Sequence, residues 1–350
     1  MKVAGLVSGL SADGIDAVMA EIELCEGGRI AARPLISRWS PHPAPMRRRI
    51  LQPPAGVGEL ACLHWELGAC LGDAALSVMG GPGRADLVGS HGQTVWHRPD
   101  DGVSLQLGEP AAIAERAGVP VVANFRSADL AAGGCGGPVV PFADWHLLSD
   151  EKESRACVNL GAIARVTVLP AGGGLQDLAA FDVGPANLLI DACGGDQGGT
   201  AALLGRVDQG LLTELLEHPF FGRRPPKSCG TEEFGPVFVE KASSRNLARP
   251  DLMATLVALT GESLSRALAG HRVDRLLISG GGVYNRAMVR ELGRRFRGVL
   301  PTDAFGIGAR AKEALAFAVL AFAAWRRIPA GLPLVTGARH ASVLGQTCWP

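Results

Sequence analysis

One carboxylate stands out in the most informative segment of the chain, AFDVGPANLLID, which runs from Ala180 to Asp191. Asp182 follows a short apolar run typical of a strand, and Gly184 opens a predicted glycine turn that leads into an apolar, helical run. A carboxylate at a strand end can act as a general base, and a neighbouring glycine lets a phosphate or sugar approach the backbone. Asp182 is therefore the candidate catalytic base. A strand, a turn and an N-capped helix, with Asp182 as a plain turn residue, would give the same pattern.

A second candidate site is the glycine-rich segment Gly9–Gly14, between predicted strands over Lys2–Ser8 and Ile15–Leu24. Its backbone amides suit phosphate oxygens, Ser11 adds a hydroxyl, and the Asp13 carboxylate can hold water on magnesium. The segment is no Walker A loop, because the Gly-Lys-Ser/Thr ending is missing and a strand follows where a helix should.

Two further polar segments follow apolar runs. A predicted polar turn over 89–94 carries Ser90, His91 and Gln93, a density of donors and acceptors that favours a polyhydroxylated ligand over a packed histidine. Arg126 and Asp129 follow the apolar run VPVVANF and either contact a ligand or form a structural ion pair.

The remaining candidate residues lie where two predicted helices begin. The segment RLLISGGGVYNRAMVRELGRRF predicts a buried strand, three glycines at 280–282 and an amphipathic helix, a turn that suits either a phosphate or close packing. Glu313 begins the apolar helix EALAFAVLAFAAW, where a first-turn glutamate is favourable against the helix dipole.

The composition bounds the class of protein. A chain of 350 residues with 47% hydrophobic residues predicts two domains. Lysine plus arginine and aspartate plus glutamate number 34 each, so no global positive field favours nucleic acid or an anionic membrane. The eight cysteines show no CxxC pair or zinc spacing, and the apolar run at 314–325 is too short to span a bilayer. These features predict a soluble, cytoplasmic protein.

The elements that must position these residues occur twice. CVNL, a turn at Gly161 and IARVTVL, over 157–169, repeat the plan of the first hairpin. The units DLVGSHGQ and AAFDVGPAN also correspond and come in the same order, which predicts a duplicated α/β domain. Between the halves, AGGCGGPVVP at 132–141 suits either a hinge or a surface loop.

Together these segments resemble the anhydro-N-acetylmuramic acid kinases, a family of the sugar kinase, heat-shock ATPase and actin superfamily. The likeness spans nearly the whole chain. The segments that carry it are GLVSGLSADGID, VGSHGQTVWHRP, LQLGEPAAIAERAGVPVVANFRSADLAAGG, AFDVGPANLLIDA, PPKSCGTEEF, LLISGGGVYNR, TDAFGI with EALAFA, and PLVTGARHASVLG.

The resemblance implies an α/β fold of two ribonuclease-H-like, actin-like ATPase lobes, with ATP and sugar meeting in a cleft between them. We expect the first lobe over 1–127, with 328–350 returning to it, and the second over 128–327. The implied reaction hydrolyses the 1,6-anhydro bond of 1,6-anhydro-N-acetylmuramic acid and phosphorylates O6, giving N-acetylmuramic acid 6-phosphate and ADP in peptidoglycan recycling. ATP and Mg²⁺ would be the cofactors, and the resemblance suggests a homodimer. The balanced charge predicts no nucleic-acid or membrane partner.

The resemblance also assigns roles. Asp182 matches the base that takes a proton from the attacking water, and Glu313 matches an acidic residue near the reacting sugar. Metal ligands would be Asp13, Asp182 and Glu313, and sugar contacts would come from Ser90, His91, Gln93, Arg126 and Asp129. The ATP-binding residues would be Gly9, Leu10, Ser11, Ala12, Asp13, Gly14, Ile15, Asp16, Gly184, Asn187, Gly280, Gly281, Gly282 and Asn285.

Five positions depart from the family pattern. Leu10 and Val183 stand where we expect threonine, Ala162 and Ala186 where we expect glycine, and Arg165 where we expect asparagine. The acid–base residues are retained, so we expect the departures to alter phosphate contacts and substrate choice. Two alternatives stay open: a kinase for another anhydro sugar such as levoglucosan, and a homologue that binds nucleotide or sugar without turnover.

Overall fold

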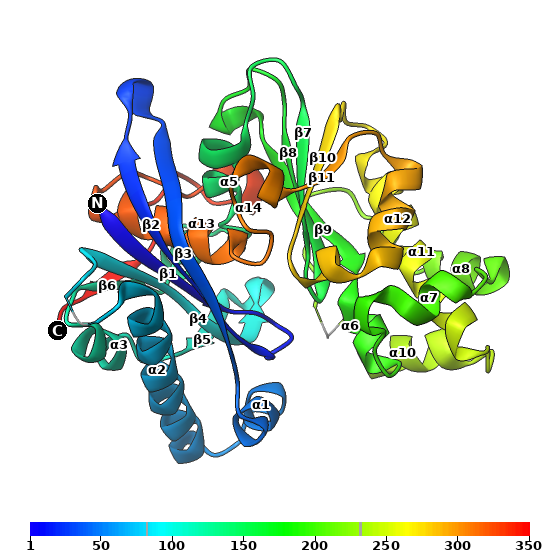
Figure 1. The fold of residues 1–350 in the computed structure, drawn as a ribbon, viewed down its shortest axis with the longest axis horizontal. Coiled ribbons are helices and arrows are strands. Elements are labelled where there is room, and N and C mark those ends of the chain that lie inside the picture. Colours follow the sequence, from blue (N-terminus) through cyan, green and yellow to red (C-terminus); the bar gives the residue numbers. More distant parts are fainter. Residues whose placement is uncertain (82, 231–232) are drawn as a thin grey trace. The chain divides into compact units, whose positions relative to one another are not determined.

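The computed structural model describes residues 1–81, 83–230 and 233–350, which form two compact units (Figure 1). The first unit contains Met1–Leu147 and Gly306–Pro350, and the second contains Leu148–Phe305. Residues 128–147 and 306–327 thus lie in the first unit, whereas the sequence assigned them to the second lobe. The predicted hinge at 132–141 is likewise inside the first unit.

The sheet of the first unit has the strand order β12-β6-β4-β1-β2-β3, with β5 paired to β4. Strands β1, β2 and β3 are successive antiparallel neighbours, and β4 and β6 run parallel to β1. The strands are β1 (Lys2–Ser8), β2 (Gly14–Leu24), β3 (Ile30–Pro41), β4 (Leu87–Arg98), β5 (Val103–Leu107), β6 (Val121–Ala123) and β12 (Gln346–Cys348). The predicted hairpin with a glycine-rich tip is confirmed.

The sheet of the second unit repeats this plan in the order β11-β10-β7-β8-β9. Strands β7, β8 and β9 are antiparallel neighbours, and β10 and β11 run parallel to β7. The strands are β7 (Arg155–Leu160), β8 (Ile163–Leu169), β9 (Ala179–Pro185), β10 (Arg275–Ser279) and β11 (Val299–Pro301). Both sheets have the same central order and strand directions, so the predicted duplication of a ribonuclease-H-like α/β unit is confirmed.

Helices pack against both sheets. In the first unit they are α1 (Ala44–Leu51), α2 (Val57–Met79), α3 (Pro110–Ala117), α4 (Ser127–Ala131), α5 (Pro141–Leu148), α13 (Lys312–Trp325) and α14 (Pro333–Thr336). In the second unit they are α6 (Asn187–Ala192), α7 (Thr200–Leu204), α8 (Gln209–Leu216), α9 (Pro219–Gly222), α10 (Pro236–Ser243), α11 (Arg249–Leu268) and α12 (Arg286–Arg295). No helix in the described part of the chain is long and apolar enough to cross a membrane.

Helix α13 is buried in the first unit, and its many small alanine side chains let it pack closely on the sheet. Every residue from Ala314 to Ala323 is buried. The helix approaches the sheet so closely that a Cβ added at Gly5 of β1 would overlap the Ala314 carbonyl. A Cβ at Gly89 of β4 would likewise meet the Phe317 carbonyl. This packing fixes the start of α13, and therefore Glu313, against the sheet that carries the phosphate-loop candidate.

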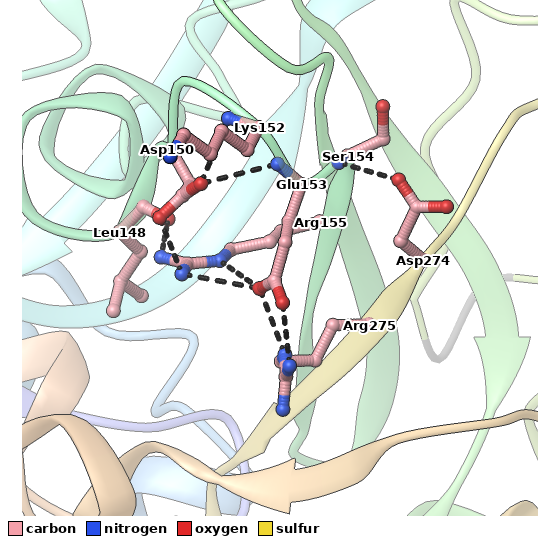
Figure 2. A network of polar contacts seen from close by, with 8 residues as sticks. All are labelled: Leu148, Asp150, Lys152, Glu153, Ser154, Arg155, Asp274 and Arg275. Carbon is pink, nitrogen blue, oxygen red and sulfur yellow. Dashed lines mark hydrogen bonds and ion pairs between the residues drawn. The ribbon is translucent and has the colours of Figure 1, made fainter.

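A polar network holds the beginning of the second unit (Figure 2). Arg155 on β7 is 8% exposed and donates hydrogen bonds to the Leu148 carbonyl, at 2.9 Å, and to Asp150, at 2.8 Å. Arg155 and Arg275 both donate to Glu153, and the Arg275 hydrogen bond is the main reason that the pKa of Glu153 is lowered. The network joins the first residues of the unit to the paired ends of β7 and β10.

Candidate active-site residues

Asp182 lies in the middle of a strand, so its predicted place at a strand end is wrong. Strand β9 continues to Pro185, because Gly184, at φ 146°, keeps pairing with Ala164 after a shift in register between Ala164 and Arg165. Asp182 is 3% exposed. The register places Arg165 of β8 directly opposite Asp182.

Both oxygens of the Asp182 carboxylate accept hydrogen bonds within the second unit. Arg165 Nε donates to Oδ1 at 2.8 Å, and the backbone N–H of Cys229 donates to Oδ2 at 2.9 Å. The Asp182 N–H in turn donates to the Lys227 carbonyl at 3.1 Å. The carboxylate is thus fixed in position and its charge is balanced by Arg165, one of the five departures from the family pattern.

Sequence reasoning gave no role to Lys227 and Cys229, which border Asp182. Burial lowers the pKa of the Lys227 ammonium, which lies 4.5 Å from the Phe220 ring centroid. Both residues belong to the segment PPKSCGTEEF, which only the family resemblance singled out. Thr231 and Glu232 of that segment lie outside the described residues.

The residues around Asp182 that were predicted to touch nucleotide make structural contacts. Asn187 Nδ2 donates to the carbonyls of Leu160 and Gly161, both at 2.9 Å, and so closes the β7–β8 turn. Val183 and Ala186 are buried in the apolar core of the unit. These two departures therefore lie in packing positions, and nucleotide contacts by Gly184 and Asn187 stay a prediction.

The glycine-rich tip of the first hairpin is a tight turn in the first unit. The Ala12 N–H donates to the Gly9 carbonyl at 3.0 Å, and the Ser11 hydroxyl donates to Asp13 Oδ1 at 2.8 Å. Leu10 is 42% exposed at a central position of this turn. Gly14, Ile15 and Asp16 already belong to β2, so the predicted phosphate-binding residues are divided between a turn and a strand.

Asp16 is the tip carboxylate with the strongest perturbation. Burial is the main cause that raises the pKa of Asp16 to about 6, and the nearby charges of Asp13 and Glu313 act in the same direction. Arg310, which precedes α13, opposes this shift and donates from Nε to Asp16 Oδ1 at 2.7 Å. The same guanidinium donates to Asp13 Oδ2 at 3.0 Å.

A buried network that the sequence analysis missed supports the base of the tip. The Ser8 hydroxyl lies 2.6 Å from Gln93 Oε1 and 2.8 Å from His42 Nε2. The His42 backbone N–H donates to the Asp13 carbonyl at 3.0 Å, and burial lowers the pKa of the His42 imidazole. His42 stands alone between prolines in the sequence, and no motif there pointed to this contact.

The predicted polar turn at 89–94 is wrong, because these residues lie within strand β4. The pairing of β1 with β4 is irregular between Leu6 and Ser8, and Gly92 has φ 71°, so a distortion of the strand stands in place of a turn. Ser90 is buried, and its hydroxyl has no hydrogen-bond partner in the described ranges. The His91 ring packs on Phe317 with centroids 4.5 Å apart.

Arg126 and Asp129 hold the loop that follows α4. Arg126 Nε donates to His91 Nε2 at 3.2 Å, and its Nη1 donates to the Gly136 carbonyl at 3.0 Å. Asp129, 1% exposed, accepts from the Gly136 N–H at 2.8 Å and from the Thr336 hydroxyl at 2.7 Å. These contacts are structural. Sugar binding stays a prediction for the five residues to which it was assigned: Ser90, His91, Gln93, Arg126 and Asp129.

The two predicted helix starts are confirmed as local structures. Glu313 lies in the first turn of α13, next to Lys312, which forms a buried ion pair with Asp144. Gly280–Gly282 connect β10 to α12, and Asn285 Oδ1 caps that helix by accepting from the Met288 N–H at 3.0 Å. Roles in the reaction and in ATP binding stay predictions for these residues.

The oxygen donors of the first unit suit a hard cation such as Mg²⁺. Within the described residues, no three acidic, histidine or cysteine side chains gather into a group that could hold a metal alone. Of the predicted ligands, Asp13 and Glu313 lie in the first unit and Asp182 in the second. Mg²⁺ in kinases is bound largely by substrate phosphates with one or two carboxylates, and metal binding by Asp13, Asp182 and Glu313 stays a prediction.

The duplicated strand order defines the class by its architecture: an α/β protein of two compact units whose sheets share the same central strand order. The family model of anhydro-N-acetylmuramic acid kinase (AnmK) matches residues 1–350. The chain therefore belongs to the anhydro-N-acetylmuramic acid kinase family, and the predicted enzyme class, a kinase, is confirmed.

Relatives align along the whole chain. An anhydro-N-acetylmuramic acid kinase of Salinibacter ruber is 41% identical over 99% of this chain and 96% of its own length. Proteins of the same name from Streptomyces coelicolor and Gloeobacter violaceus are also 41% identical, over 99% and 97% of this chain and 93% and 97% of their own lengths.

Proposed function

We propose that the protein is an ATP-dependent kinase that opens 1,6-anhydro-N-acetylmuramic acid and phosphorylates its O6. The observation that carries the proposal is the fixed, charge-balanced carboxylate of Asp182 in a chain of this family. The products would be N-acetylmuramic acid 6-phosphate and ADP. We further propose a cytoplasmic homodimer that serves peptidoglycan recycling.

Asp182 would act as the general base. Each of its oxygens accepts one hydrogen bond and has a further lone pair, which can take a proton from water. The water oxygen would bond to the anomeric carbon, the bond from that carbon to O6 would break, and O6 would keep the electron pair. The freed O6 would attack the γ-phosphorus, and the β–γ bridging oxygen would leave with ADP.

The tip residues Gly9–Asp16 would hold the triphosphate. Exposed backbone amides at such a turn bind phosphate oxygens, and Ser11 adds a hydroxyl. Bound Mg²⁺, held by the phosphates with Asp13 and Glu313, would offset charge on the transferred group. Phosphoryl transfer asks a protein mainly for positioning and charge stabilisation, and these residues would supply both.

The test is ADP release by the purified protein with three additions: 1,6-anhydro-N-acetylmuramic acid, levoglucosan, and no sugar. We expect release with the muramic sugar alone, and mass spectrometry should find the 6-phosphate product with one oxygen from labelled water. Release with levoglucosan alone would assign a different anhydro sugar. Binding of nucleotide with no release under any condition would identify a homologue without turnover.

A further inference from the structure

The hairpin tip lacks a cation of its own. Residues 9–16 contain two carboxylates, Asp13 and Asp16, and no lysine or arginine. A triphosphate carries several negative charges, so two carboxylates beside its binding amides would repel it. Besides bound Mg²⁺, side chains outside the tip can bring positive charge to this region. Arg47 donates from Nη2 to the Ser11 carbonyl at 3.4 Å, and Arg310 contacts the carboxylates.

Arg310 supplies that charge from a distant part of the sequence. Its guanidinium donates from Nη2 to Asp13 at 3.0 Å and from Nε to Asp16 at 2.7 Å. Its central carbon lies 4.3 Å from the ring centroid of Trp39, on β3. Two carboxylates and an aromatic face thus hold the guanidinium in one orientation.

Part of the guanidinium faces solvent. The Arg310 side chain is 34% exposed, and its Nη1 has no hydrogen-bond partner within the described ranges. The planar guanidinium can bind carboxylate along one edge and phosphate along another, which a lysine ammonium does less well. Asp13 Oδ1 is occupied by the Ser11 hydroxyl, so the tip and the guanidinium form one connected unit.

We propose that Arg310 is a phosphate-binding residue for the terminal phosphates of the nucleotide, and that Asp13, Asp16 and Trp39 position it. The inference rests on the proposed function, since it assumes that the tip binds a triphosphate. Arg310 would offset part of the charge of the two carboxylates and give the γ-phosphate a charged donor. The phosphate on the sugar product presents the same chemistry, so the experiment separates the two sources.

The experiment measures binding of a non-hydrolysable ATP analogue, ADP and N-acetylmuramic acid 6-phosphate by calorimetry, without turnover. We expect Arg310→Met to weaken the ATP analogue by about 10- to 100-fold, the range for a hydrogen bond to a charged group. ADP should weaken less, the sugar phosphate should bind unchanged, and Arg310→Lys should restore part of the affinity. Arg33→Met is the matched control, because Arg33 pairs with Glu21 on the same hairpin sheet and is 70% exposed.

Thermal unfolding of each variant checks that it is folded. If folded Arg310→Met binds the ATP analogue as tightly as wild type, the inference is overturned and Arg310 has only a structural role in its ion pairs. Weakening of the sugar phosphate alone would also overturn it, by assigning Arg310 to the other ligand. Wild-type protein that binds no triphosphate would instead overturn the proposed function, and the inference with it.

Discussion

The two units each carry an arginine paired with a candidate carboxylate, and the pairs differ in burial. In the second unit the Asp182 side chain is 4% exposed and Arg165 33% exposed. In the first unit the side chains of Asp13 and Asp16 are 47% and 23% exposed beside Arg310. The two arginines are thus about equally exposed, and the difference lies in the carboxylates: Asp182 is buried, Asp16 is half-buried and Asp13 is exposed.

Burial decides what each arginine does. A buried carboxylate that loses its partner keeps its charge in a poor solvent, which is costly. An ion pair with an exposed carboxylate such as Asp13 contributes little to stability, so Arg310 can exchange that contact for a ligand at low cost. We expect Arg165 to matter for stability and for the position of Asp182, and Arg310 to matter for binding.

The largest expected effect comes from the buried carboxylate itself. Asp182→Asn should lower sugar-dependent ADP release by about 10²- to 10⁴-fold, because asparagine is nearly isosteric but cannot accept the water proton. Initial rates at saturating ATP are the measurement. Asp73→Asn, at a carboxylate that is 62% exposed, is the control. Wild-type turnover in folded Asp182→Asn would remove Asp182 from the mechanism.

The next effect concerns the stability difference between the two pairs. Arg165→Met should lower the free energy of unfolding by about 2–3 kcal/mol, because Asp182 loses a charged hydrogen bond while buried. Arg310→Met should lower it by less than Arg165→Met does, because Asp13 and Asp16 are 47% and 23% exposed and can be solvated in its place. Denaturant unfolding measures both, and a double-mutant cycle with Asp182→Asn isolates the pair. Equal costs for the two arginines would contradict the comparison.

Asp16 predicts a pH dependence of stability. Burial raises its pKa from 3.8 to about 6 in the folded state, so the folded protein binds more protons than the unfolded chain between these values. Stability contributed by this group is therefore full below about pH 4 and falls as the pH rises to about 6. Relative to Asp16→Asn, wild type should lose about 1–3 kcal/mol over this range. The measurement is the free energy of unfolding of both proteins at pH 4 and pH 7. If the difference between wild type and Asp16→Asn is the same at both pH values, folding does not raise the pKa of Asp16.

The smallest expected effect tests the exposed tip. Leu10→Thr should strengthen binding of an ATP analogue by about 0.5–1.5 kcal/mol through one neutral hydrogen bond, with sugar affinity unchanged. The 42% exposure of Leu10 means that the substitution removes little buried surface. Calorimetry is the measurement. If ATP-analogue affinity and turnover both stay at the wild-type level, Leu10 is accommodated without cost.

The local elements and the duplication can be predicted from the amino-acid sequence alone. Local structure depends on residues that are close in sequence, so its patterns can be recognised there. Examples are the alternating apolar residues of β2, the glycine-rich tip before it and the strand, glycine turn and helix around Gly280. The repeated order of these elements predicted two similar sheets. Family motifs added the kinase class, because many colinear segments agree.

The partners of the charged and polar side chains, by contrast, depend on the folded structure. Arg310 lies almost 300 positions after Asp13 and Asp16, and nothing local connects them. Arg165 stands opposite Asp182 only because a register shift in β8–β9 places it there, and a one-residue change of register would turn its side chain to the other face. The membership of α13 in the first unit likewise depends on where the helix packs, which its own apolar sequence does not specify. Charge pairing, burial and register are non-local, so only the folded chain fixes them.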